Sequence, residues 1–206
     1  MNCRTTGPDM KRSLIYKHIY IYRFVMNLIY VGRYRDRFMN IINLIGPDVR
    51  SLCDLCFGDT IIAERCRSRG IHWTGIDLNH HFCRRARKQG FNAIGGDLFS
   101  LEHTNADVYI MAGSLYHFHT KISSLFDLIL SHTNRFILSE PIQNLSSMDG
   151  MFGWWAKHTA NPGSGNTLFR YNKQTLLETL RNEQKRKGFE FRVVSINRDI
   201  LVEINY

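Results

Sequence analysis

The chain has 206 residues, of which 44% are hydrophobic and 22% are charged. These values exclude a disordered or fibrous protein and fit one globular domain with a single core. The net charge of +9 favours anionic partners, and five cysteines, an odd number with no signal-peptide pattern before them, predict reduced thiols in the cytoplasm.

The first 46 residues are predicted to form one or two amphipathic helices that cap the rest of the same domain. Seven Lys or Arg residues and one acid lie from Lys11 to Arg37, and aromatic residues are interleaved with them. The longest apolar run, 19–31, is too short to span a bilayer. A weak association with a membrane surface stays open for this segment, as do cofactor contacts by Tyr30 and Tyr34, and nucleic-acid binding is the weaker alternative.

A strand, a tight turn and a helix are predicted after Gly46-Pro47-Asp48. Ser51–Cys56 is short and mostly apolar, which is typical of a buried parallel strand, and Phe57-Gly58 ends it. Asp59–Ser68 then has apolar residues at helical spacing. Such a turn places backbone N–H groups at the edge of a parallel sheet, where a nucleotide-like ligand can bind.

The alternation of strands and helices continues through the rest of the chain. The predicted strands are Ile71–Ile76, Phe91–Gly95, Ala106–Ala112 and Arg135–Ser139; the predicted helices run from Asn79 to about Gln89, over Thr120–Ser131, and from Asn172 to about Lys187. Ser100–Asn105 is so short that a turn is expected in place of a helix. Two apolar runs about Asn197-Arg198 predict a terminal β-hairpin.

Three acids follow three successive predicted strands, namely Asp54, Asp77 and Asp97. With the loop Asp54-Leu55-Cys56-Phe57-Gly58, they resemble the class I (Rossmann-like) S-adenosylmethionine-dependent methyltransferases, whose first loop reads D/E-x-G-x-G. The resemblance covers residues 47–206 and implies an α/β, doubly wound, mainly parallel seven-stranded sheet with a C-terminal antiparallel hairpin, preceded here by N-terminal helices.

The resemblance also implies S-adenosyl-L-methionine as cofactor and a set of residues that bind it. In the family the first loop wraps the methionine part, the second acid binds the ribose hydroxyls and the third bonds the adenine amine. Cys56 stands where the first glycine of the loop is expected. The cofactor-binding residues implied for this chain are Asp54, Cys56, Phe57, Gly58, Asp77, Leu78, Asp97, Leu98, Gly113 and Ser114.

Catalytic and acceptor-binding residues are expected where the later strands end, at the same edge of the sheet. His117 is the leading candidate for a general base, and Glu140 is the second. A strand-end acid such as Glu140 can instead bond backbone N–H groups. The irregular stretch Ile142–Tyr171 is expected to cover the acceptor, and the candidate acceptor-binding residues are Tyr116, Trp154, Trp155, His158 and Arg170.

The predicted reaction is transfer of a methyl group to oxygen or nitrogen of a small-molecule or glycan-like acceptor, and the basic charge balance favours an anionic one. An inactive cofactor-binding or scaffold protein of the same fold is the main alternative, supported by Cys56. A nicotinamide oxidoreductase is disfavoured because it would need G-x-G-x-x-G, and Asp59 would repel a pyrophosphate. A redox pair at Cys53-x-x-Cys56 and a metal site at His117-x-His119 are weaker readings, and no metal is predicted.

Overall fold

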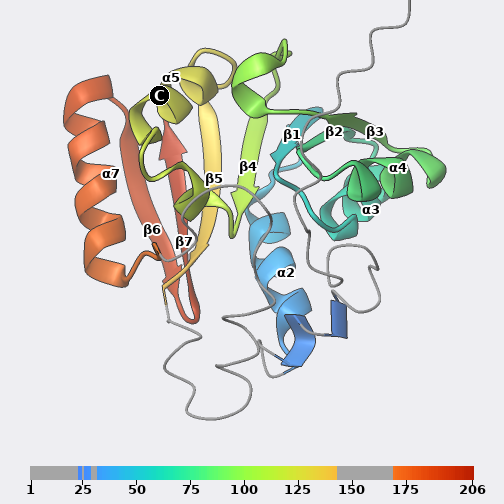
Figure 1. The fold of residues 1–206 in the computed structure, drawn as a ribbon, viewed down its shortest axis with the longest axis horizontal. Coiled ribbons are helices and arrows are strands. Elements are labelled where there is room, and N and C mark those ends of the chain that lie inside the picture. The colour runs from blue at the N-terminus through green and yellow to red at the C-terminus, as the bar shows by residue number, and fades with distance from the viewer. Residues whose placement is uncertain (1–22, 25, 29–31, 143–168) are drawn as a thin grey trace, which may run out of the picture.

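Seven strands form one sheet, in the order β3-β2-β1-β4-β5-β7-β6 (Figure 1). The computed structural model describes residues 23–24, 26–28, 32–142 and 169–206. The strands are β1 (Ser51–Leu55), β2 (His72–Asp77), β3 (Asn92–Gly95), β4 (Val108–Ala112), β5 (Arg135–Pro141), β6 (Glu190–Ile196) and β7 (Asp199–Asn205). The first five are mutually parallel, and β7 is antiparallel to both of its neighbours. The predicted mainly parallel sheet with a terminal antiparallel hairpin is therefore confirmed.

Helices lie on both faces of this sheet. They are α2 (Tyr34–Leu44), α3 (Ile61–Ser68), α4 (His80–Lys88), α5 (Ile122–Leu130) and α7 (Lys173–Lys187), with short 3₁₀ turns η2 (Leu98–Ser100) and η3 (Leu115–Phe118). Within the described residues, no helix has the length and apolar character needed to cross a membrane.

Each face of the sheet carries its own buried hydrophobic cluster, because successive side chains of a strand point to opposite faces. Leu52, Val108 and Ile110 point to the face covered by α2, α3 and α4. Tyr109 and Met111 point to the face covered by α5 and α7. Figure 1 shows α7 beside β6 and α4 near β3, at the two ends of the sheet, and the two clusters place these helices on opposite faces, as in a doubly wound sheet.

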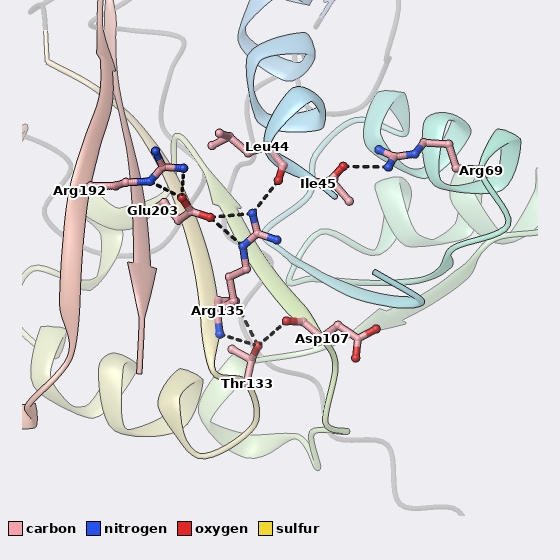
Figure 2. A network of polar contacts seen from close by, with 8 residues as sticks. All are labelled: Leu44, Ile45, Arg69, Asp107, Thr133, Arg135, Arg192 and Glu203. Atoms are coloured by element: carbon pink, nitrogen blue, oxygen red, sulfur yellow. Dashed lines mark hydrogen bonds and ion pairs between the residues drawn. The ribbon is translucent and has the colours of Figure 1, made fainter. Parts of the chain in front are cut away.

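Polar contacts near the amino ends of the parallel strands hold the C-terminus of α2 to β5 and to the end of α3 (Figure 2). The guanidinium of Arg135 donates to the carbonyl oxygen of Leu44 at 2.6 Å, and Arg69 donates to that of Ile45 at 2.8 Å. These bonds satisfy carbonyls at the C-terminus of α2, which have no partner within the helix. Glu203 on β7 accepts hydrogen bonds from Arg135 on β5 and Arg192 on β6, so it joins three strands. Burial raises the pKa of Glu203, but these two arginines outweigh it and hold the pKa below its usual value.

The observed element ends differ from the predicted ones by a few residues. The helix after the first strand begins at Ile61 and not at Asp59. Thr60 is its N-cap residue: the Thr60 carbonyl oxygen accepts from the N–H of Glu64, and the Asp59 carboxylate accepts from the N–H of Thr60. β5 continues through Pro141 because β7 pairs with it antiparallel as far as Asp199. Asn172 caps α7 as predicted, through a reciprocal pair of bonds with Thr175.

Candidate functional site

The strand order reverses between β1 and β4, and the loop after β1 lies at that point. Cys56 has a φ of 55° and Gly58 a φ of 57°, both in the left-handed region. A cysteine there carries a steric cost that glycine does not. The Cys56 N–H donates to the carbonyl oxygen of Ile76 at 2.7 Å, which keeps the loop against β2. Cys56 thus takes the backbone conformation that suits a glycine.

Asp77 closes this loop from the end of β2. Its Oδ2 accepts a hydrogen bond from the N–H of Gly58 at 3.0 Å, and its Oδ1 accepts one from the N–H of Asn79 at 2.7 Å. The position of Asp77 fits the predicted ribose-binding role, although the side chain also has a structural one.

Asp54 lies beneath the loop and is 1% exposed. The indole Nε1 of Trp73 donates to its Oδ2 at 3.3 Å, from the face of the sheet covered by α3. Burial raises the pKa of Asp54 to about 8. Asp54 therefore supports the loop from inside the protein and is not open to solvent.

The third acid, Asp97, is exposed at the end of β3. Its Oδ1 accepts from the N–H of Phe99 at 2.8 Å and so caps η2. Leu98 beside it is 4% exposed, whereas Leu78 after β2 is 46% exposed. Leu78, which directly follows Asp77, is therefore an apolar side chain exposed to solvent at the carboxyl end of β2.

Gly113 and Ser114 follow β4. Gly113 has a φ of 73°, and a Cβ there would lie 2.2 Å from a guanidinium nitrogen of Arg37. Glycine is therefore required at this position by both backbone and space. Ser114 lies at the Cys56 thiol: burial raises the pKa of that thiol, and the hydrogen bond from Ser114 opposes the rise.

Arg37, from the buried face of α2, is a site residue that the sequence analysis missed. Its Nε lies 2.7 Å from Oδ2 of Asp199, and its Nη2 donates to the carbonyl oxygen of Ser139 at 3.1 Å. Ser139 also donates its hydroxyl to Asp199 at 3.0 Å. A sequence signal exists for its burial but not for its partners, because Arg37 is spaced with Tyr34, Phe38 and Ile41 on the apolar side of the helix. Tyr34 itself is 1% exposed and packs edge-on against Phe38, so it belongs to the core.

Glu140 takes the structural role that the sequence left open. It is 0% exposed, and its carboxylate accepts from the N–H groups of Leu115 at 3.0 Å and Tyr116 at 3.3 Å. Burial raises its pKa to about 7, and Arg37 opposes the rise. Glu140 therefore fixes η3, the turn that carries His117, and a direct catalytic role for it stays a prediction.

His117, Tyr116 and Arg170 come together. The ring centroids of Tyr116 and His117 are 3.9 Å apart, and Cζ of Arg170 lies 3.8 Å from the Tyr116 ring centroid. Burial lowers the pKa of His117 to about 4, with a further contribution from the Arg170 charge. His117 is therefore neutral at pH 7 and a weak base.

The metal and redox readings find no support in the described residues. His119 stacks on Phe169 at 4.3 Å and bonds the Tyr116 carbonyl oxygen, and the described chain holds no group of three His, Cys, Asp or Glu fit for a metal. Cys53 and Cys56 are both free thiols, and burial raises the pKa of Cys53 to about 12. Trp154, Trp155 and His158 lie outside the described residues.

Arg23 binds the loop after β1 from the N-terminal segment. Its Nε and Nη2 donate to the two carboxylate oxygens of Asp59, at 2.8 Å and 2.6 Å. The Asp59 side chain is 0% exposed, so its charge is paired where it is buried. The repulsion of a pyrophosphate by Asp59, one argument against an oxidoreductase, is therefore weakened. The lack of a G-x-G-x-x-G motif after β1 remains as an argument against that class of enzyme.

No family model matches this sequence, and no curated protein matches it. Solved structures do. The methyltransferase domain of bacterial CtHen1 matches with a TM-score of 0.65 and 11% identity, over 83% of this chain and 97% of that one. Magnesium protoporphyrin IX methyltransferase from Synechocystis, with bound SAH, matches with a TM-score of 0.61 and 14% identity, over 89% of this chain and 86% of that one. Human N-acetylserotonin methyltransferase, in complex with SAM, matches with 0.62 and 17%, over 93% of this chain and 57% of that one.

Proposed function

Because the chain has the fold of the class I, Rossmann-like methyltransferases, we propose that it binds S-adenosyl-L-methionine and transfers the methyl group to a small-molecule or glycan-like acceptor. The observation that carries the proposal is the hydrogen bond from the N–H of Gly58 to the carboxylate of Asp77, beside the point between β1 and β4 where the strand order reverses. Ligands of open α/β sheets bind at that position. The φ of Cys56 also supports the proposal, since this residue keeps the left-handed backbone conformation that suits the glycine expected at its position.

The residues present fit this cofactor. The loop Cys56–Gly58 would hold its methionine part, with Gly113 and Ser114 opposite. Asp77 would accept from the ribose hydroxyls, and Asp97 from the adenine amine. Leu78, which is exposed, and Leu98, which is largely buried, would pack on the adenine ring.

The cofactor, when bound, supplies a methyl group on a positively charged sulfur that a nucleophile can attack. The chain has to orient the acceptor and exclude water. Glu140 holds the η3 backbone, and through it His117 and Tyr116, at the edge where β4 ends. Arg170 adds a fixed positive charge over Tyr116, which favours an anionic acceptor.

The weak basicity of His117 bears on the acceptor atom. A base with a pKa of about 4 removes a proton poorly from an alcohol at neutral pH. We therefore favour an acceptor that needs little help, namely an unprotonated nitrogen or an acidic oxygen such as a carboxylate or phenol.

Calorimetric titration with S-adenosylhomocysteine tests the cofactor assignment. The unmodified protein should bind it, and Asp77→Ala should weaken binding more than tenfold, because charge-assisted hydrogen bonds are worth ~1.5–3 kcal/mol each. Asp127→Ala is the matched control, since Asp127 is an exposed acid on α5. Absence of binding by the unmodified protein, or equal affinity of Asp77→Ala and Asp127→Ala, would refute the assignment.

A further inference from the structure

One face of α4 is covered by basic side chains. Six of its nine residues are His, Arg or Lys, and none is acidic. Phe82, Cys83 and Ala86 face the core, so the basic residues are left to the outer side. The exposed ones are His80, His81, Arg84, Arg87 and Lys88.

The neighbouring helix extends this surface. Arg67 on α3 donates to the carbonyl oxygen of Gln89, the C-cap of α4, and its guanidinium lies 3.8 Å from the ring centroid of Phe91. Arg65 on the same helix is exposed. On the described helices α3 and α4, the one acid is Glu64, and it bonds the Thr60 hydroxyl. We call the exposed basic residues of α3 and α4 the basic face.

The helix dipole does not explain the basic face. It favours cations in the last turn, but His80 and His81 lie in the first. Arg84 is followed by Arg87 three residues later and by Lys88 four residues later, and like charges at these spacings destabilise a helix. Helix α7 is different, because an exposed acid, Glu178, accompanies its cations and Arg186 pairs with the buried Glu183.

The basic face is also hollowed. His80, Arg84, Arg87 and Lys88 line a depression of about 440 Å³. The Nε of Arg87 donates to the carbonyl oxygen of Ala93 at 2.6 Å, which fixes the direction of that guanidinium. A shallow depression lined by cations can present several of them to the phosphate groups of a narrow, flexible chain, whereas a lipid bilayer is a broad flat surface. Arginine, the commonest residue here, matches the geometry of phosphate oxygens.

From this charge complementarity and shape we propose that the basic face binds the phosphodiester backbone of a nucleic acid. The face covers the outside of α4, on the side of the sheet opposite η3 and His117. Nucleic acid bound there is a docked partner and not the methyl acceptor. The proposal does not depend on cofactor binding, so either can fail alone.

Fluorescence anisotropy with a labelled single-stranded oligouridine, and with a DNA duplex of equal length, tests the proposal. Arg84→Glu/Lys88→Glu should weaken binding at least tenfold. For the single strand it should also reduce the slope of log affinity against log salt by about 1.4, since each phosphate contact contributes ~0.7. Arg181→Glu/Lys185→Glu makes the same change at the same spacing on α7 and should alter affinity less than threefold. The probe that binds with the higher affinity shows whether the basic face prefers single-stranded RNA or duplex DNA.

Three results would overturn the proposal: no binding of either probe, equal losses in both variants, or an α4-dependent binding of phosphatidylserine vesicles without binding of the oligonucleotides. Arg84 and Lys88 are exposed, so both variants should keep the melting temperature of the parent. If the charge reversal prevents folding, Arg84→Gln/Lys88→Gln replaces it, with an expected loss of at least threefold.

Discussion

The N–H of Gly58 and the carboxylate of Asp77 are joined by a 3.0 Å hydrogen bond across the ends of β1 and β2. The other carboxylate oxygen bonds the N–H of Asn79, which begins the turn into α4. One side chain therefore fixes the loop after β1 and the N-terminus of the next helix.

Replacing Asp77 by Ala should free both amides in the absence of any ligand. A hydrogen bond to a charged group is worth ~1.5–3 kcal/mol, so hydrogen exchange at Gly58 and Asn79 should accelerate roughly tenfold or more. The amide of Cys56 is the internal control, because it donates to Ile76 and should be unaffected. Unchanged exchange at Gly58 would show that other contacts hold the loop.

Replacing Arg23 by Ala should leave the buried carboxylate of Asp59 without its bidentate partner. Because Arg23 is 32% exposed, we expect a loss of roughly 1–3 kcal/mol in the free energy of unfolding by urea. Asp59→Asn in the same background should recover part of the loss, since it removes the unpaired charge. Arg33→Ala, at an exposed position nearby, should change stability by less than ~0.5 kcal/mol. Equal effects of Arg23→Ala and Arg33→Ala would contradict the importance of the pair.

Cys56 should tolerate glycine better than any larger residue. Its φ of 55° carries a cost of ~1–2 kcal/mol that glycine avoids, partly offset by the greater freedom of glycine in the unfolded chain. Melting temperatures should follow the order Gly, then Ala, then Val, with Val lowest because β-branched residues are least suited to this region. A Val variant as stable as the Gly variant would mean that the loop changes conformation.

Glu140 should make stability fall as pH rises. Its folded-state pKa of about 7 lies above the ordinary 4.5, so between those values the folded protein binds more protons than the unfolded chain. Its contribution is complete below pH 4.5 and is lost as pH rises through 7. Relative to Glu140→Gln, the parent should lose up to about 3 kcal/mol of unfolding free energy between pH 5 and pH 8. Glu190→Gln, at an exposed position on β6, should leave the profile of the parent unchanged.

The sequence predicted the strands and the positions of the three acids because both depend on local patterns. Short apolar runs, Gly58 and the cap at Asn172 act within a few residues of themselves. The acids then lie at one edge of the sheet simply because parallel strands share it. Even Cys56, which departs from the expected glycine, occupies the predicted place in the loop.

The contacts that complete the site could not be predicted in this way. Arg23 and Asp59 are 36 residues apart, and Arg37 meets Ser139 102 residues later. Neither pair leaves a local pattern. The roles of Glu140 and His117 depend on how deeply their side chains are buried. The sequence does not predict the burial of a polar residue at or after the end of a strand. Glu140 therefore holds backbone N–H groups, and His117 has a lowered pKa.

The placement of β7 has a consequence for how the protein folds during synthesis. In the sheet, β6 touches β7 alone, and β7 is made after β6. When β5 leaves the ribosome its outer edge has no partner, and α7 and β6 are made before β7, the strand that joins β6 to the sheet. Until β7 pairs with both, the outer edge of β5 and both edges of β6 are unpaired, and unpaired strand edges are sites where newly made proteins associate wrongly.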